Sequence, residues 1–212
     1  TLAHVYVRVV TINSRLGPLG FLAHPWLSEE AASDSAVGTS GNYGLMDKIA
    51  ALQWVKRNIE VLGGDPQNVT IFGQSAGSQS VCSLMTAPSA QGLFHKAIGQ
   101  SAACVNQLTK ADANGHERGQ ALVDALGVSS IEDLRSAEPD ALLVAMTKSN
   151  WESDSRIVID GRVLPRWPHE VFAAGEQSDI PLMLGFLADE GYELFEPERA
   201  LTAAELQGSL ES

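Results

Sequence analysis

The sequence predicts an α/β fold with a mostly parallel sheet, and two observations carry this prediction. Strand-like and helix-like segments alternate along the chain, which is the pattern of strand–helix–strand units with parallel strands. The β-branched and aromatic run at 69–72 also leads through a tight Gly-rich turn straight into a helical segment at 78–85. Together they indicate one sheet with four recognisable strands, all running in the same direction.

The first part of the chain predicts a strand, a loop and a long helix. Residues 5–12 are mostly β-branched and are expected to form a central strand that ends at the turn residues 16–20. The segment 24–43 is rich in Ser, Ala, Gly and acidic residues, so we expect a long surface loop there. Apolar residues then recur at helical spacing from 45 to 62, before a Gly-Gly-Asp-Pro run ends this helix.

The second part predicts two more strands with helices between them. Residues 96–100 form a short third strand, and the polar, helical pattern of 105–156 predicts a helical insertion before the fourth strand at 180–185. An Asp-Gly pair inside 157–164 indicates a β-hairpin, and 171–174 reads as a short helix that ends at a glycine. We expect residues 1–212 to form a single domain.

Composition and charge narrow the classes of function. Hydrophobic residues make up 44% of the chain and no apolar run reaches the length of about 20 residues that spans a bilayer, so a globular chain without a membrane span is expected. Fourteen basic against 26 acidic residues give a net charge of −12, which disfavours nucleic acid as a partner. Cys82 is expected to be a buried free thiol, with a disulfide to Cys104 as the less favoured alternative. Trp54 and Phe72 are expected in the core.

The tight turn at 73–77 has the sequence Gly-x-Ser-x-Gly, which is typical of a nucleophile elbow. In this arrangement a strained serine between a strand and a helix lifts its hydroxyl above the sheet. Ser75 is therefore the candidate nucleophile, and the N–H of Ala76 is a candidate oxyanion donor at the start of the helix. The alternative is a Gly/Ser-rich turn without chemistry.

Acidic side chains follow the fourth predicted strand at Asp189 and Glu190. Catalytic groups of open α/β sheets lie outside the carboxyl ends of the strands, so this acidic pair and Ser75 are expected at the same edge. The residue types and spacings indicate no metal site and no nucleotide or other cofactor.

Several segments match a known family in order and with compatible spacing over nearly the whole chain. On these segments the chain resembles the type-B carboxylesterases, a family of α/β-hydrolases that also contains the cholinesterases and several fungal lipases. The matching segments are INSRLGPLGFL at 12–22, GNYGLMD at 41–47, ALQWV at 51–55, FGQSAGS at 72–78, GLFHKAI at 92–98, DGRVLP at 160–165 and DEG at 189–191.

The resemblance implies an α/β-hydrolase core and a serine hydrolase that cleaves small-molecule carboxylic esters through an acyl-enzyme on Ser75. It implies that Glu190 is the acid of the catalytic triad and that the Ala76 N–H is one of three oxyanion donors. Ser101 takes the place of a family serine that hydrogen-bonds near the triad acid. Gln74 stands before the nucleophile, where the cholinesterases have a glutamate.

The chain also departs from the family pattern. Ser14 replaces a tyrosine and Ala102 replaces a glycine, and family members are more than twice as long as this chain. Their Gly-Gly oxyanion loop lies upstream of the matched region and their triad histidine lies downstream of Glu190, after which this chain contains no histidine. The chain is thus expected to be the middle portion of an esterase, nearly inert alone and prone to self-association through open strand edges.

Two alternatives to an active esterase stay open. The chain could be a catalytically incomplete fragment, or it could belong to a non-catalytic, cholinesterase-like interaction protein. Of the five histidines, His169 is the best internal substitute for the missing base, although no motif supports it, and His95 matches a family position with a structural role. His4, His24 and His116 are expected at a strand end or in solvated loops and helix edges.

Overall fold

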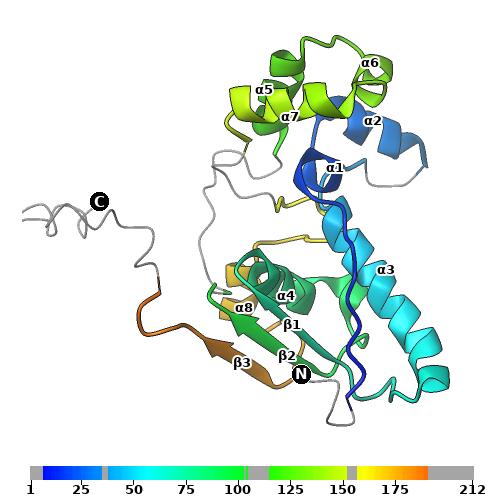
Figure 1. Ribbon diagram of the computed structural model, residues 1–212, viewed down its shortest axis with the longest axis vertical. Coiled ribbons are helices and arrows are strands. Elements are labelled where there is room, and N and C mark those ends of the chain that lie inside the picture. Colours follow the sequence, from blue (N-terminus) through cyan, green and yellow to red (C-terminus); the bar gives the residue numbers. More distant parts are fainter. Residues whose placement is uncertain (1–6, 35–37, 103, 105–114, 152–156, 191–212) are drawn as a thin grey trace, which may run out of the picture.

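A three-stranded parallel sheet lies at the centre of the described structure (Figure 1). The computed structural model describes residues 7–34, 38–102, 104, 115–151 and 157–190. The strands β1 (Thr70–Gln74), β2 (Lys96–Gln100) and β3 (Leu182–Gly185) are adjacent in this order. Gln74 pairs with Gln100, which pairs with Gly185, so the three carboxyl ends are level. The parallel α/β architecture and the last three predicted strands are confirmed.

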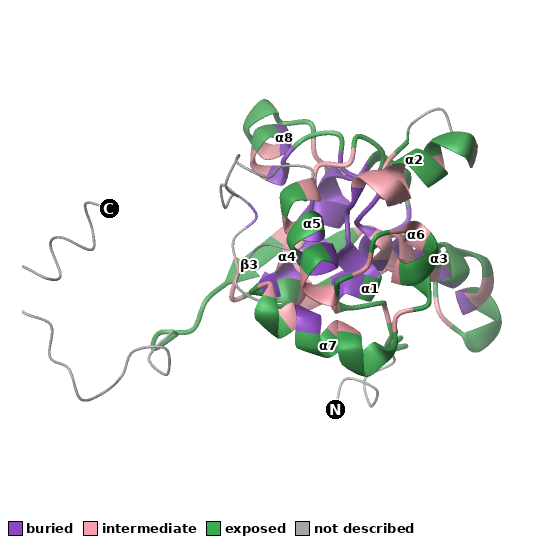
Figure 2. Cartoon of the chain, turned by 90° about the horizontal axis from the view of Figure 1, so that it is seen from above, coloured by how far each residue is buried: buried purple, intermediate pink, exposed green. Residues whose placement is uncertain are grey.

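Helices cover one face of this sheet. α4 (Ala76–Thr86) connects β1 to β2 and packs on both strands, with α8 (Pro168–Ala174) beside it (Figure 1). Ile71 and Ala97, on the face toward α4, are buried, whereas the neighbouring residues of both strands are more exposed. Figure 2 shows the buried residues gathered in the middle of the molecule and an exposed β3 at its side.

The long predicted helix is present. Of its periodic apolar residues Leu45, Ile49, Leu52 and Ile59 are buried, whereas Leu62 is exposed. α3 (Tyr43–Asn58) continues into a 3₁₀ turn, η2 (Ile59–Leu62), and a second 3₁₀ turn, η3 (Pro88–Ala90), follows α4. The main core combines α3, α4, the sheet and the segment before α8; its buried residues are Phe21, Leu45, Ile49, Leu52, Ile71, Val81, Leu84, Met85, Ala87, Ala90, Leu93, Phe94, Ala97, Val163 and Leu164. Trp54 and Phe72 do not belong to it, because 44% and 54% of their surfaces are exposed.

The described part of the region between β2 and β3 contains three helices before α8. α5 (His116–Leu126), α6 (Ile131–Arg135) and α7 (Pro139–Lys148) lie away from the sheet, next to α1 (Gly17–Phe21) and α2 (Pro25–Asp34) (Figure 1). They have a small core of their own that includes Leu22, Leu122, Ala145 and Trp151. The helical character predicted for 105–156 is confirmed for these three helices, while its treatment as an insertion within one domain stays a prediction. Among the described residues, no helix combines the length and apolar composition needed to cross a membrane.

The predicted first strand is wrong over its described part. Residues 7–12 form no strand; they run exposed alongside α3 (Figure 1), and Val7 and Ile12 each expose 46% of their surface. β-branched composition predicts a residue that fits a half-buried pleated surface, but a strand also needs a hydrogen-bonded neighbour. Within the described residues the sheet ends at β1, so this segment has no such neighbour.

The predicted loop at 24–43 is also wrong, because α2 occupies its first half. His24 supplies a reason: its Nδ1 accepts a hydrogen bond of 3.2 Å from the N–H of Trp26, in the first turn of the helix. A side chain thus satisfies one of the N–H groups that a helix start leaves without a partner. The same histidine is 1% exposed, so the expectation of a solvated His24 is wrong as well.

The predicted hairpin at 157–164 is a turn without a strand ladder. The Asp160 Oδ1 atom accepts hydrogen bonds from the N–H groups of Val163 at 2.9 Å and Leu164 at 2.8 Å. Before the turn, the N–H and C=O of Val158 both bond to the side-chain amide of Asn42, at 3.2 and 2.8 Å. Side chains therefore supply the partners that a cross-strand ladder would have provided.

Candidate active site

Ser75 lies in the turn between β1 and α4 with a backbone conformation that non-glycine residues rarely adopt. Its φ and ψ are 54° and −118°, and the residue is exposed. The turn is tight because Gly73 lies directly against the helix: a Cβ atom on Gly73 would lie 2.4 Å from the Gly77 carbonyl carbon. The local geometry expected of an elbow is therefore present, with a strained serine at the point where the strand passes into the helix.

The first turn of α4 presents N–H groups beside Ser75. The Gln79 N–H donates to the Ser75 carbonyl at 3.1 Å, so the N–H groups of Ala76, Gly77 and Ser78 precede the first hydrogen bond of the helix. Ala76 is exposed, and its N–H lies at the positive end of the helix dipole. This end of α4 can therefore stabilise negative charge that develops next to the Ser75 hydroxyl.

Ser101 occupies the corresponding position after β2. It follows Gln100 directly, its φ is 58°, and its N–H donates a 2.8 Å hydrogen bond to the Gly185 carbonyl of β3. Because the carboxyl ends of β1 and β2 are level and neighbouring strands lie about 4.8 Å apart, Ser75 and Ser101 emerge side by side. Gln74, the last residue of β1, is exposed at the same edge.

Glu190 follows the carboxyl end of β3 but is not in contact with either serine in the interactions of the described residues. Its Oε2 atom accepts a hydrogen bond of 2.9 Å from the Leu187 N–H, which closes a local turn. The chain beyond β3 leads away from α4 (Figure 1), and Glu190 is exposed. The structure thus brings Ser75, Ala76, Gln74 and Ser101 together, and it leaves Glu190 at the end of the neighbouring strand.

The described histidines have other surroundings. His95 accepts a 3.2 Å hydrogen bond at Nδ1 from the Val69 N–H, which confirms a structural role at the start of β2. His24 Nε2 lies 3.1 Å from a side-chain oxygen of Gln120, and His116 Nε2 lies 3.3 Å from the Ser28 hydroxyl. Among the described residues, no histidine is hydrogen-bonded to the Ser75 hydroxyl, and His4 lies outside them.

A cavity in the described structure lies apart from Ser75, Ser101 and Glu190, none of which lines it. It has a volume of about 180 Å³ and is lined by Ser28, Gly38, Thr39, Ser40, His116, Ile159 and Asp160. None of the predicted site residues lines it. Among the described residues, no cluster of three or more His, Cys, Asp or Glu side chains is arranged to hold a metal ion.

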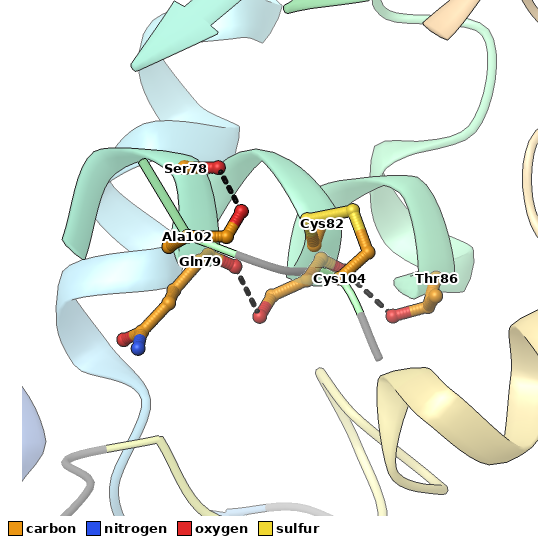
Figure 3. The surroundings of a disulfide bond; sticks show 7 residues. Ser78, Gln79, Cys82, Thr86, Ala102 and Cys104 are labelled. Carbon is orange, nitrogen blue, oxygen red and sulfur yellow. Dashed lines mark hydrogen bonds between the residues drawn. A yellow bond between two sulfur atoms is a disulfide. The ribbon is translucent and has the colours of Figure 1, made fainter. Parts of the chain in front are cut away.

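Sequence reasoning missed two contacts that hold the segment after Ser101 (Figure 3). Cys82 and Cys104 form a disulfide, with their Cα atoms 5.0 Å apart, so the expectation of a free Cys82 thiol is wrong and the less favoured alternative is correct. The Ser78 hydroxyl donates a 2.9 Å hydrogen bond to the Ala102 carbonyl. The sequence contained one signal for these contacts, the spacing of Ser78 and Cys82. They are one helical turn apart, so they lie on the same face of a helix that must pack against the strand preceding Cys104.

Comparison with known proteins identifies one family. A model of the carboxylesterase family matches residues 1–206. The para-nitrobenzyl esterase of Bacillus subtilis is 41% identical over an alignment of 216 positions, which covers 97% of this chain and 42% of that esterase. The fumonisin B1 esterase of Sphingopyxis macrogoltabida is 40% identical over 90% of this chain and 35% of its own length.

Solved structures give the same result. A para-nitrobenzyl esterase structure superposes with a TM-score of 0.75 at 34% identity, over 93% of this chain and 42% of the other. A carboxylesterase of Geobacillus stearothermophilus superposes with a TM-score of 0.76 at 36% identity, over 94% and 43%. The α/β-hydrolase core is thereby confirmed. The chain spans less than half the length of these four relatives, and it belongs to the carboxylesterase family.

Proposed function

We propose that this chain supplies the nucleophile and the triad acid of a serine hydrolase that cleaves small-molecule carboxylic esters. One observation carries the proposal: Ser75 has a φ of 54° at the β1–α4 turn, with exposed surface and with the start of α4 beside it. A backbone strain of this kind is worth about 1–3 kcal/mol and persists where the surrounding structure enforces it. Because the chain belongs to the carboxylesterase family, we interpret the strained serine as the nucleophile.

The proposed reaction proceeds through an acyl-enzyme. The Ser75 Oγ attacks the ester carbonyl carbon while a histidine takes its proton, and the resulting oxyanion accepts hydrogen bonds from backbone N–H groups that include Ala76. The same histidine then protonates the departing alcohol, and water releases the carboxylate from Ser75 by the reverse sequence. Glu190 orients the histidine.

The histidine and the Gly-Gly oxyanion loop belong, in this proposal, to polypeptide outside the 212 residues. The relatives that the chain matches are more than twice as long as the matched segment, which leaves room for both parts. The turn that carries Glu190 has no partner histidine among the described contacts, so its carboxylate bonds to the Leu187 N–H instead. A longer polypeptide would let Glu190 exchange this local bond for the histidine.

Gln74 points to the class of ester. It is exposed at the carboxyl edge of the sheet next to Ser75, and its neutral amide adds no negative charge to the site. A cationic alcohol group therefore gains no ion pair at this position. We expect uncharged esters to be the better substrates, and nucleic acid, which the net charge of −12 repels, to be none.

The proposal is tested by supplying the missing parts. The 212 residues replace the matched segment in the B. subtilis para-nitrobenzyl esterase, and the hydrolysis of p-nitrophenyl acetate by this chimera is measured. Ser75→Ala should reduce turnover by about 10⁴-fold or more. Ser80→Ala removes another α4 hydroxyl, one that donates to the Ala76 carbonyl at 2.9 Å, and should leave turnover nearly unchanged. Equal loss in both variants, or none in either, would contradict the proposal.

The second candidate is a chain that is catalytically incomplete by itself. It is favoured by the described histidines, none of which bonds to the Ser75 hydroxyl, and by the local bond of Glu190. Assay of the unmodified 212-residue chain with the same ester distinguishes the two: an active chimera with an inert chain supports incompleteness, whereas Ser75-dependent turnover by the chain contradicts it. A non-catalytic interaction protein predicts that the chimera is inert as well.

A further inference from the structure

The segment that follows β2 is attached to α4 at two points one helical turn apart (Figure 3). Ser78 donates its hydroxyl hydrogen to the Ala102 carbonyl at 2.9 Å, and four residues further along α4 Cys82 is joined to Cys104 by the disulfide. Residues four apart on a helix lie on the same face, so both attachments come from one side of α4.

Ser78 and both cysteines are buried, and the hydrogen bond from Ser78 to Ala102 is partly buried. Ser78 is 0% exposed, Cys82 is 2% exposed and Cys104 is 5% exposed. α4 and β2 are also in close contact beside Ser78, because a Cβ atom on Gly99 would lie 2.5 Å from the Ser78 Oγ. Loss of either attachment would leave a buried group without its partner, without any space for the helix to move closer.

The residue that these attachments hold in place is Ser101. Its φ of 58° is unfavourable for a serine and requires that both of its ends be fixed. One end is fixed by its N–H, which donates to the Gly185 carbonyl of β3 at 2.8 Å. The other end is fixed by Ala102 and Cys104, through their contacts with α4.

The same helix begins at the proposed nucleophile. Ser78 is three residues after Ser75 and lies in the first turn of α4. Any displacement of Ser101 and Ala102 relative to α4 is therefore a displacement of Ser101 relative to Ser75. The packing of α4 on β1 and β2 alone does not fix this, because Ala102 and Cys104 lie beyond the end of β2.

We propose that Ser78 and the Cys82–Cys104 disulfide are positioning residues, which hold the Ser101 segment in register with Ser75 in the ester-hydrolysing site. The role in catalysis rests on the function proposed above, whereas the attachment of the segment to α4 does not depend on that function. The nearest comparison within the chain is Ser80, also buried on α4, whose hydroxyl donates to a carbonyl of its own helix and fixes no other segment.

Amide hydrogen exchange of the 212-residue chain, followed by NMR, tests the attachment without requiring activity. The Ser101 N–H bonds to Gly185 and the Ala97 N–H bonds to Pro181 at 3.0 Å, so the two report opposite ends of the β2–β3 pair. Ser78→Ala should raise the exchange rate of Ser101 relative to Ala97 by about two- to tenfold, the usual effect of one lost hydrogen bond. The double variant Cys82→Ala with Cys104→Ala should raise it further, and Ser80→Ala should leave the ratio unchanged.

An unchanged ratio of Ser101 to Ala97 exchange in Ser78→Ala overturns the proposal. Should the double cysteine variant fail to fold, Ser78→Ala still decides the matter, since it removes one oxygen atom and adds no bulk. An equal rise at Ser101 and Ala97 also overturns it, because this would show general destabilisation of the sheet rather than a local release.

The positioning role is tested separately in the chimera described above. Ser78→Ala should lower kcat by about two- to tenfold and leave KM and the thermal midpoint close to those of Ser80→Ala. If the chimera is inert even with Ser78 intact, the proposed function is contradicted. The hydrogen-exchange experiment still tests the attachment of the Ser101 segment to α4 in that case. If kcat for Ser78→Ala and Ser80→Ala is the same, the role in positioning is overturned.

Discussion

The backbone N–H of Ser75 donates a 2.8 Å hydrogen bond to the carbonyl of Gln100. This bond extends the β1–β2 ladder by one residue into the turn, so the elbow is tied to the neighbouring strand as well as to its own helix. Ser101 repeats the arrangement one strand further on, where its N–H bonds to Gly185. Two adjacent serines with positive φ are thus held at the carboxyl edge by the same type of contact.

The elbow depends on Gly73 more than on Gly77. A Cβ atom on Gly73 would lie 2.4 Å from the Gly77 carbonyl carbon, whereas a Cβ atom on Gly77 would meet nothing within 4 Å. Gly73→Ala should therefore lower the free energy of unfolding by about 1–3 kcal/mol through overpacking. Gly77→Ala, inside a helix, should raise it by about 0.5–1 kcal/mol. Urea denaturation of both variants checks this, and equal destabilisation would contradict the packing described here.

Glu190 should matter for catalysis and little for stability. In the chimera with the B. subtilis esterase, Glu190→Gln should lower kcat by about 10³- to 10⁴-fold, because a neutral amide cannot orient and stabilise the histidine as a carboxylate does. Asp189→Asn is the matched control and should change kcat by less than about tenfold. Comparable losses of kcat in the two variants would contradict the assignment of Glu190 as the triad acid.

Stability at low pH should depend on Asp47. Hydrogen bonds from Arg15 hold the pKa of the Asp47 carboxyl below its ordinary value of 3.8, so its ionised form favours the folded state. This contribution is present above the pKa of the unfolded chain and is lost as pH falls through the lowered pKa of the folded chain. The Arg15 side chain is 51% exposed, so Asp47→Asn should cost about 0.5–1 kcal/mol at pH 7.

The measurement is the free energy of unfolding of both proteins between pH 7 and pH 2. The difference between them should shrink to near zero as pH approaches 2. Glu30→Gln, which breaks the more exposed ion pair with Arg135, serves as a control and should have a smaller effect at pH 7. A difference that is independent of pH would show that Asp47 acts through packing rather than charge.

No described helix covers one face of the sheet, and we expect this face to cause self-association of the chain. Phe72 pairs in register with Ile98, which pairs with Met183, and Phe72 and Met183 expose 54% and 65% of their surfaces. An apolar row of this kind beside an unpaired strand edge favours contact between copies. Phe72→Ser should shift sedimentation velocity profiles toward the monomer. Val61→Ser, at a residue 85% exposed on η2, should not, and a monomeric parent chain would contradict the prediction.

Local sequence pattern was sufficient to predict the elements that are stabilised by residues close to them in the chain. The strand at 96–100, the helix from 43 onward and the strand–turn–helix around Ser75 are present because alternation, helical period and glycine placement all favour the same structure. The prediction of a strand at 5–12 was wrong because β-branched composition indicates a segment that can be buried. It does not show whether a partner strand is present to bury that segment.

Contacts between distant segments were the part that the sequence could not show. α2 is capped by a histidine side chain, and residue 158 bonds to Asn42, which is 116 positions away in the chain. The disulfide between Cys82 and Cys104 likewise depends on how closely α4 packs on β2, which two glycines on the strands determine. For the same reason, the sequence identified Ser75 as a candidate but did not reveal how the segment of Ser101 is attached beside it.

The most direct test of the central claim identifies the residue that a carboxylic ester acylates. The chimera is treated with a fluorophosphonate, which reacts with activated serines, and the modified peptide is located by mass spectrometry. The account predicts that the adduct lies on Ser75, that Ser75→Ala abolishes it and that Ser80→Ala retains it. An adduct on another serine, in a chimera that still hydrolyses p-nitrophenyl acetate, would contradict the assignment of Ser75 as the nucleophile.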